Sequence, residues 1–179
     1  MFVIQASLAH GQLRCRWMPR VLDNPRAGER IVIRCSQPEV LEFDVFLQPG
    51  AHVPAGHTHP YQEERFSVLA GRLRFRVGRR DVLAGPGSTL CVPSGTRHWF
   101  GNVGADVARV RVEVRPALRM EALLETTARS ARLPFVERLL GLSLIPLDFP
   151  QEVGVPHVPA WLVSVALTPV AWLRGVLAR

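Results

Sequence analysis

The sequence contains no lysine, and all 22 of its basic residues are arginine. With 15 acidic residues the net charge is +7, which would suit a nucleic acid or an acidic membrane surface. In residues 72–77 and 109–112, however, arginines alternate with apolar residues, as on a strand with one face in water. The sequence also lacks a helix-turn-helix, an RNA-binding motif and aromatic residues interleaved with basic ones. We therefore expect a solvated exterior and no nucleic-acid partner.

Cysteine is scarce, with Cys15, Cys35 and Cys91 far apart and no CxxC pair. Their odd number and wide spacing argue against a disulfide framework and predict a reducing compartment. The first residues are apolar, but no charged segment precedes them and Gln5, His10 and Gln12 soon interrupt them, which is not typical of a secretory signal. We therefore expect a cytoplasmic protein.

Two common catalytic signatures are also missing. The sequence contains neither a glycine-rich phosphate loop that leads into a helix nor a GxSxG nucleophile motif. Instead, many short apolar segments are separated by glycine and proline clusters, which predicts an antiparallel sandwich or barrel. The predicted strands are residues 31–33, 40–48, 52–59, 64–69, 72–77, 81–84, 89–92, 97–101 and 107–114.

The two ends of the chain differ from this middle part. Residues 2–30 are expected to form an arm with one or two strands, while residues 117–131 and 134–142 have the composition and spacing of helices. Residues 158–177 form an apolar run almost long enough to span a membrane. Because prolines and Arg174 interrupt this run, we expect an amphipathic or buried helix that covers the barrel or a subunit interface, and no membrane span.

Four side chains stand out as candidate metal ligands. His57 and His59 are two residues apart, so on an extended strand both imidazoles project from one face. Glu64 begins the next strand after a turn, and His98 begins another after the Pro93–Gly95 turn signal. Three imidazoles and one carboxylate suit a divalent first-row metal, and iron, manganese, nickel, zinc or copper all remain open. Glu63 is a competing carboxylate, but it would point to the opposite face of the strand.

The spacing of these residues resembles the two motifs of the cupin superfamily. The segment from Gly87 through Pro93, Gly95 and His98 to Asn102 matches the second motif without a departure. The segment from His57 through His59 and Glu64 to Gly71 matches the first, although Gly50 lies one position farther from His57 than usual.

The resemblance covers residues 31–116 and implies a mainly β fold, an antiparallel cupin-type β-barrel of the jelly-roll or double-stranded β-helix kind. It implies that His57, His59, Glu64 and His98 bind one metal inside that barrel. Three parts follow: an N-terminal arm (1–30), the cupin barrel (31–116) and a helical C-terminal extension (117–179). In many cupins such an arm pairs with a neighbouring subunit, which implies a homo-oligomer, most simply a dimer.

The surroundings of the ligands favour a small-molecule partner. Aromatic residues near them predict an apolar pocket, for which the candidates are Phe43, Tyr61, Phe66, Phe75 and Trp99. The arginines are expected to face outward, so a sugar phosphate is a poorer fit than an apolar or phenolic metabolite. We expect a metal-dependent enzyme, either dioxygenase-like or a Lewis-acid cyclase or isomerase, whose catalytic residues the sequence does not identify. A non-catalytic small-molecule or metal-binding barrel and a scaffold are the alternatives.

Overall fold

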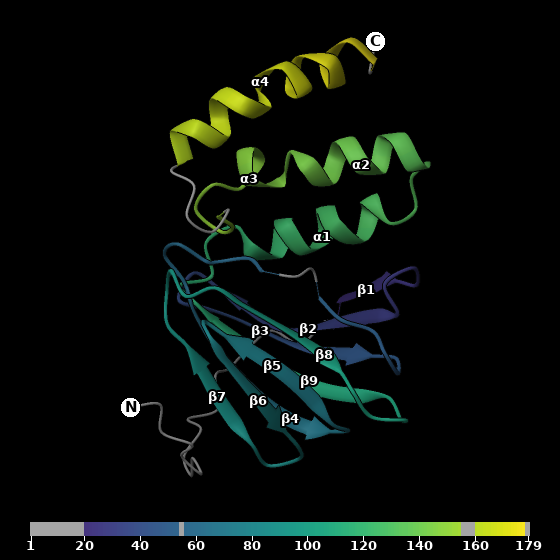
Figure 1. Cartoon of the computed structure of the whole chain (residues 1–179), viewed down its shortest axis with the longest axis vertical. Helices are drawn as coiled ribbons and strands as arrows, with labels where there is room; N and C mark the ends of the chain where they lie inside the picture. Colours follow the sequence, from purple (N-terminus) through teal and green to yellow (C-terminus); the bar gives the residue numbers. More distant parts are fainter. Residues whose placement is uncertain (1–19, 54–55, 155–159, 178–179) are drawn as a thin grey trace.

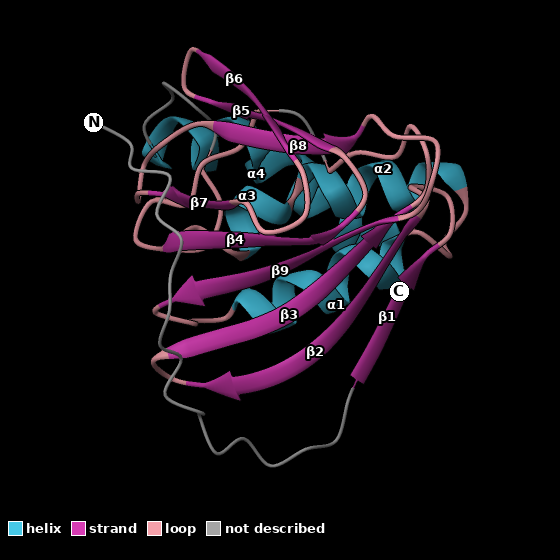
Figure 2. Cartoon of the chain, turned by 90° about the horizontal axis from the view of Figure 1, so that it is seen from below, coloured by secondary structure: helices cyan, strands magenta, loops and turns pink. Residues whose placement is uncertain are grey.

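The computed structural model describes residues 20–53, 56–154 and 160–177, and it contains two antiparallel β-sheets with helices at one end (Figures 1 and 2). The larger sheet has the strand order β1-β2-β3-β9-β4-β7, and the smaller has the order β6-β5-β8. Every strand pair is antiparallel, as expected for a jelly roll. The strands are β1 (Arg20–Asn24), β2 (Glu29–Gln37), β3 (Val40–Leu47), β4 (Glu63–Ala70), β5 (Leu73–Val77), β6 (Arg80–Ala84), β7 (Thr89–Val92), β8 (His98–Asn102) and β9 (Ala108–Arg115).

The mainly β fold predicted from the sequence is confirmed, with the two sheets facing each other rather than closing into a continuous hydrogen-bonded barrel. The core lies between them, where Phe66 of β4 contacts Phe75 of β5 and Phe100 of β8 at ring-centroid distances of 5.3 and 5.2 Å. The last strand of the expected arm, β1, pairs with β2 of its own chain. Residues 1–19 of that arm lie outside the described residues.

Strand β3 shows why the two faces of the larger sheet differ. Leu41, Phe43, Val45 and Leu47 occupy every second position of the strand and are buried in the core. Their partners on β9 in the strand register are small or branched apolar residues, so a continuous apolar layer forms on the inner face. The intervening residues, Asp44 among them, lie on the outer face.

Asp44 is the centre of an ion-pair cluster on this outer face. Its side chain is fully buried and accepts hydrogen bonds from Arg34 (2.7 and 3.0 Å), Arg109 (2.6 Å) and Arg111 (2.9 Å), each from a different position on β2 or β9. Burial alone would raise the pKa of Asp44, but these arginines hold it below its ordinary value. We call these four residues the Asp44 cluster. The arginines of β9 are therefore ion-paired, not simply solvated.

The segment before β4 is less regular than the sequence suggests. We expected a strand over residues 52–59, but the structure has single bridges from His52 to Gly101 and from His57 to His98. Gly56 has a φ of +70°, which is outside the β region, and Pro60 has no N–H to donate to a ladder. Residues 54–55 lie outside the described part. A continuous strand is therefore wrong here, although the bridges still hold the histidines against β8.

The C-terminal part is helical, as expected, with α1 (Met120–Ser130), α2 (Phe135–Ser143), α3 (Ile145–Asp148) and α4 (Ala160–Leu177). Helix α1 lies next to the larger sheet (Figure 1), where Glu121 accepts a hydrogen bond from Ser36 of β2 at 2.6 Å and pairs with Arg20 of β1 at 3.1 Å. Met120 and Leu123 add their side chains to the core. The helices therefore form one layer over an end of the sheets.

Helix α4 is the outermost element of this layer (Figure 1) and packs against α2 and α3. The expectation that it covers the barrel is wrong, since α1, α2 and α3 lie between α4 and the sheets. Its residues Val165 and Trp172 are 67% and 70% exposed. Among the described residues, no helix is long and apolar enough to cross a membrane.

The cysteines also differ from expectation. Cys35, which is buried in β2, is disulfide-bonded, whereas Cys91 in β7 is a free thiol. Cys15 lies outside the described residues. The expectation that the chain has no disulfide is therefore wrong, because wide spacing in a sequence does not prevent folding from bringing two cysteines within bonding distance. The argument for a reducing compartment loses its support.

Candidate metal centre

Four side chains from three parts of the chain meet at one point between the sheets. His57 and His59 come from the segment before β4, Glu64 from β4 and His98 from the start of β8, and their ligand atoms all lie within 4.8 Å of one another. The imidazole centroids are 4.5 to 5.2 Å apart. His59, Glu64 and His98 are buried, whereas His57 is half-buried. The structure thus brings together the four residues that the sequence singles out as a ligand set.

Two turns of the motifs explain how these side chains are positioned. Gly95 has a φ of +71°, and its N–H donates to the carbonyl of His59 at 2.8 Å, so the turn before β8 is joined to the segment before β4. Gly71 has a φ of +78° and packs so closely that a Cβ atom there would lie 2.6 Å from the Cα of Ala108. These glycines permit close packing that other residues would disturb.

The backbone fixes the protonation of two imidazoles. The Nδ1 atom of His59 contacts the carbonyl oxygen of Glu152, and the Nδ1 atom of His98 lies 3.0 Å from the carbonyl oxygen of Thr96. Because a carbonyl oxygen can only accept, each Nδ1 carries a hydrogen and donates it. In the neutral rings the Nε2 lone pairs are then available toward the centre, as in metal-binding histidines.

The atoms that face the centre are buried and unsatisfied. The Nε2 atoms of His59 and His98 and the Oε2 atom of Glu64 have no hydrogen-bond partner of acceptable geometry within the described parts of the chain. They are close nonetheless, with Oε2 of Glu64 2.7 Å from Nε2 of His98 and 3.4 Å from Nε2 of His59. Buried polar atoms without partners are costly. A bound divalent cation would satisfy all three at once, so the donor set fits a metal ion.

Electrostatics in the cluster favour an ionised glutamate. Burial works to raise the pKa of Glu64, but the charges that His59, His98 and His57 can carry, with Nε2 of His98 only 2.7 Å away, outweigh burial and lower the pKa to about 2. Burial works to lower the pKa of His98, but the adjacent Glu64 carboxylate outweighs it and raises that pKa. The carboxylate is therefore anionic at neutral pH, as a metal ligand has to be.

Three of the five predicted pocket residues lie in the apolar core, and Phe66 is the one that borders the cluster. Phe43, Phe66 and Phe75 are at most 5% exposed, and the rings of Phe66 and His98 are 6.1 Å apart and edge-on. Phe75 stacks on Phe100 at 5.3 Å. Phe66, Phe75 and Phe100 thus contact one another in the core, and the inner side of the cluster borders on aromatic carbon at Phe66.

The other two predicted pocket residues lie elsewhere. Trp99 is opposite Arg76 in the register of β8 with β5, so it is on the other face of β8 from His98. Tyr61 is 65% exposed. Neither lies with the buried residues of the cluster. Short sequence distance from a ligand is a poor guide to position, because neighbours on a strand point to opposite sides.

The same alternation separates the two adjacent glutamates. Glu64 is buried in the cluster, whereas the Glu63 side chain is 44% exposed and lies 3.6 Å from Arg65 on the outer face. The preference for Glu64 over Glu63 agrees with this arrangement.

Sequence reasoning missed the part played by Glu152. Its carbonyl oxygen holds His59, yet it lies 93 residues farther along the chain, between α3 and α4. No sequence signal identifies it, because the contact uses a backbone atom that every residue has.

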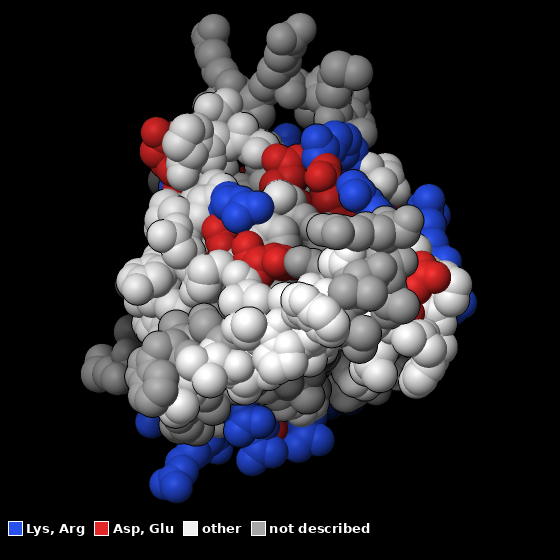
Figure 3. All heavy atoms as spheres, turned by 90° about the horizontal axis from the view of Figure 1, so that it is seen from above, with Lys and Arg blue, Asp and Glu red and all other residues white. Residues whose placement is uncertain are grey.

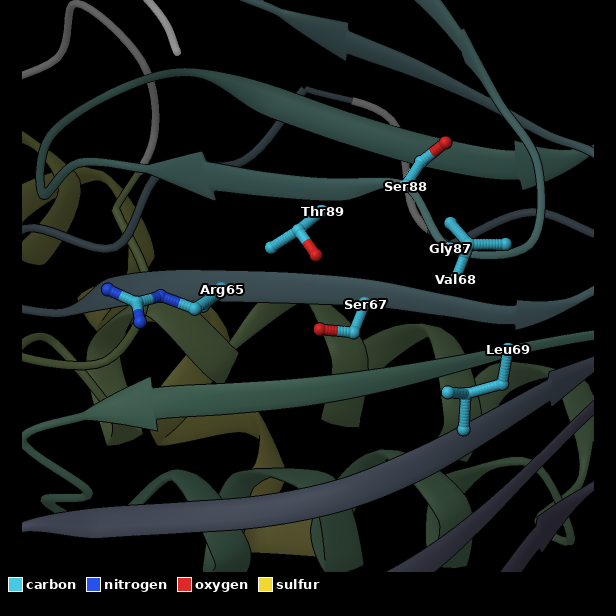
Figure 4. A pocket seen from close by; sticks show the side chains of 7 residues that line it. All are labelled: Arg65, Ser67, Val68, Leu69, Gly87, Ser88 and Thr89. Carbon is cyan, nitrogen blue, oxygen red and sulfur yellow. The ribbon is translucent and has the colours of Figure 1, made fainter. Parts of the chain in front are cut away.

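Two surface hollows lie apart from the cluster. One, of about 270 Å³, is lined by Arg65 and Ser67 of β4 and Thr89 of β7 (Figure 4), which lie on the outer face of the sheet. The other, of about 750 Å³, lies over β1, β2 and the end of β3, near Arg30 and Phe46. Neither includes a residue of the His57–His98 cluster.

An antiparallel jelly roll with three histidines and one glutamate on its inner face defines a class of small barrel proteins with a candidate metal centre. Residues 43–114 match the family model of the cupin domain. This part of the chain is therefore a cupin domain, as its motifs indicated.

The chain is also similar to individual proteins. Over 70 residues it is 33% identical to "Polyketide synthase CurC" of Streptomyces cyaneus, a stretch that covers 39% of this chain and 45% of that protein. The crystal structure of an RmlC-like cupin from Shewanella frigidimarina has a TM-score of 0.51 at 15% identity, covering 62% of this chain and 96% of that one, which shows the fold alone. A protein from Thermus thermophilus has a TM-score of 0.49 at 26% identity, covering 52% and 87%. The chain spans less than half the length of the Streptomyces protein that it matches.

Proposed function

We propose that this protein is a metal-dependent enzyme that acts on a small apolar or phenolic metabolite. The observation that carries the proposal is the set of buried, unsatisfied atoms of His59, Glu64 and His98 that face one point. Iron, manganese, nickel and zinc are the candidate ions. A bound ion of this kind supplies either dioxygen chemistry or Lewis-acid polarisation of a carbonyl or hydroxyl group.

The chain's own residues divide the work around that ion. His59 and His98 present Nε2 because their Nδ1 atoms are tied to carbonyl oxygens, and Glu64 supplies the negative charge. The buried ring of Phe66 lies edge-on to His98 and gives the inner side of the cluster an apolar border. Because His57 is the half-buried ligand, we propose that substrate approaches from its side.

The substrate class has support from two sources. The interior next to the cluster is aromatic and apolar, which favours a carbon skeleton over a sugar phosphate. The likeness to a protein named polyketide synthase points to chains that carry ketone and hydroxyl oxygens on an apolar skeleton. We therefore propose a polyketide-like enol or phenol as substrate, with dioxygenase-like oxidation as the first candidate reaction and cyclisation or isomerisation as the second.

Metal content is the first test. Protein purified anaerobically without chelators or an affinity tag should carry close to one divalent ion per chain by elemental analysis. Turnover of a panel of phenols and β-diketones should stop when a chelator removes the ion. It should return when the ion is added back. Oxygen consumption during turnover would identify the oxidation, and ring closure without oxygen would identify the Lewis-acid reaction. A chain that takes up none of the four ions would contradict the proposal.

A non-catalytic small-molecule or metal-binding barrel is the second candidate. The observation that favours it is the absence, among the described residues of the cluster, of a side chain identified as an acid or base beyond the ligands themselves. A panel compound that binds stoichiometrically to the metal-loaded protein and is recovered unchanged in air would support this role.

We also propose a homodimer in which the helical layer contacts its copy. The outer helices expose Phe135, Val136 and Leu139 of α2 and Val165 and Trp172 of α4, and Figure 3 shows uncharged atoms over much of this face. Solvent-exposed apolar surface of this kind is typical of interaction sites. Light scattering should give twice the chain mass, and a monomer would rule the dimer out.

We propose the cytoplasm as the location, with Cys35 as the residue that tests it. A cytoplasmic protein keeps thiols reduced as a rule, whereas Cys35 is disulfide-bonded here. Cell fractionation would locate the protein, and trapping of free thiols in the same fractions would show whether Cys35 is reduced or disulfide-bonded there.

A further inference from the structure

A short segment between α3 and α4, residues 149–154, contacts both the helical extension and the candidate metal centre. Thr58 and Gly154 form an antiparallel bridge, in which Gly154 N–H donates to the Thr58 carbonyl at 2.9 Å. The Thr58 hydroxyl donates to the Gly154 carbonyl at 3.2 Å. The segment therefore runs alongside the residues that carry His57 and His59. We call it the Glu152 strap.

Within the strap, Glu152 contacts both the metal centre and a helix. Its carbonyl oxygen accepts the Nδ1 hydrogen of His59. Its side chain is 1% exposed, and Oε1 accepts the backbone N–H of Arg119 at 2.8 Å. Arg119 is the N-cap residue of α1, so this bond satisfies a donor at the start of that helix.

The strap is itself held in place. Phe149 is buried in the core, and the guanidinium of Arg119 lies 4.8 Å from the centre of its ring. The backbone N–H of Glu152 donates to the Phe149 carbonyl at 3.2 Å. A movement of the strap would therefore disturb the start of α1, the core and His59 together.

The structure assigns the Glu152 strap as a positioning element that sets the ring of His59 and thereby couples metal binding to the helical extension. This assignment rests on the proposed metal-binding function. Outer contacts of a histidine ligand fix its ring and tautomer, and their loss typically lowers metal affinity by roughly 10- to 100-fold. Coupling is reciprocal, so a bound metal should in turn stabilise the strap and the start of α1.

The first experiment uses cobalt(II), titrated anaerobically into the metal-free full chain and followed by its visible absorption. A Cβ atom at Gly154 would lie 2.9 Å from the Thr58 hydroxyl and 3.2 Å from Pro60, so Gly154→Val should displace the strap. We expect its dissociation constant for cobalt to rise by about 10-fold or more, with a changed absorption spectrum. Gly175→Val is the matched control, since nothing lies within 4 Å of its added Cβ atom.

The second experiment begins with the unmodified protein, so its first result does not depend on a variant folding correctly. Cobalt should slow amide hydrogen exchange of residues 149–154 and of Arg119 in the unmodified protein. Glu152→Ala should weaken the protection at Arg119, and Glu152→Gln, which keeps an acceptor oxygen, should restore it.

Three outcomes would overturn the assignment, and they differ in what else they affect. Unchanged cobalt affinity in a folded Gly154→Val variant would refute the coupling, and so would unchanged hydrogen exchange in residues 149–154 when cobalt binds. In both cases cobalt binding by the wild-type protein would leave the proposed metal-binding function intact. A wild-type chain that binds neither cobalt nor the four candidate ions would refute both.

Discussion

Two buried carboxylates of this protein, Asp44 and Glu64, have similar surroundings but differ in whether their oxygen atoms find hydrogen-bond partners. Each is buried and each is met by three nitrogen-bearing side chains from neighbouring parts of the chain. Asp44 accepts hydrogen bonds from all three of its arginines. Glu64 approaches two of its histidines closely, yet its Oε2 atom has no hydrogen-bond partner among the described residues.

The difference lies in what the nitrogen atoms can do. A guanidinium is charged at any ordinary pH and only donates, so three of them around a carboxylate satisfy it and leave nothing to bind. An imidazole can be neutral and present a nitrogen lone pair. Three neutral imidazoles beside a negative carboxylate therefore form a set of donors that attracts a metal cation. A paired carboxylate therefore indicates a structural role here, and an unsatisfied one indicates a candidate site.

The largest expected effect comes from removing the charge of Glu64. Glu64→Gln keeps the shape but replaces an anionic ligand by a neutral amide, so the affinity for cobalt or zinc should fall by at least about 100-fold, more than the loss of an outer contact of a ligand causes. Isothermal titration of the metal-free protein measures this change.

Glu63→Gln is the matched control for that experiment. Its side chain is 44% exposed and lies by Arg65 on the outer face of the same strand. We expect its metal affinity to equal that of the wild type. Equal losses in both variants would mean that general charge, not ligation, determines binding.

The next effect should be on stability and not on metal binding. Asp44→Asn leaves three arginines around a neutral amide whose NH₂ group faces other donors. Breaking a buried pair costs about 3 to 5 kcal/mol, and the arginines are about one-third exposed, so we expect a loss of about 2 to 3 kcal/mol. Urea unfolding measures the change, and unchanged metal affinity is the second part of the prediction. A stable variant that loses metal would erase the distinction between the two carboxylates.

A smaller effect should appear when the unfolding free energies of the wild type and of Asp44→Asn are compared as a function of pH. Although burial opposes them, the arginines hold the pKa of folded Asp44 below its ordinary value of 3.8, so its contribution is fully present above that pH. The contribution is lost as the pH falls through the folded-state pKa. The difference in unfolding free energy between wild type and Asp44→Asn should thus be constant from pH 7 to about pH 4 and shrink below it. A difference that grows on acidification would have the wrong sign.

The comparison also shows how far the sequence can predict this molecule. The ligand set could be read from residue types and spacing, because short loops and strand alternation place His59 and Glu64 locally. The ring of arginines around Asp44 could not, because it depends on which strands become neighbours, and β2 and β9 are about 75 residues apart along the chain. The alternation of Arg109 and Arg111 with valines correctly placed them on the outer face but gave no sign of their partner.

Long-range contacts account for the other failures. The contact of Glu152 with His59 joins positions 93 residues apart along the chain. The predicted position of α4 was wrong for another reason. Its largely apolar composition predicts that it packs against another element, but composition does not say whether helices or a sheet will be its neighbour.

The smallest expected effects test whether the site is confined to the inner face. Trp99 adjoins His98 in the sequence but points away from it, and Tyr61 is 65% exposed. We expect Trp99→Ala and Tyr61→Ala to change the metal dissociation constant by less than about twofold, because neither side chain lies on the inner face with the ligands and substitutions away from a site rarely alter it. If Trp99→Ala weakened metal binding tenfold while the protein stayed folded, the view that only side chains on the inner face affect the metal site would be wrong. The contrast between Asp44 and Glu64 would then need a different explanation, since it too depends on which face of the sheet each carboxylate occupies.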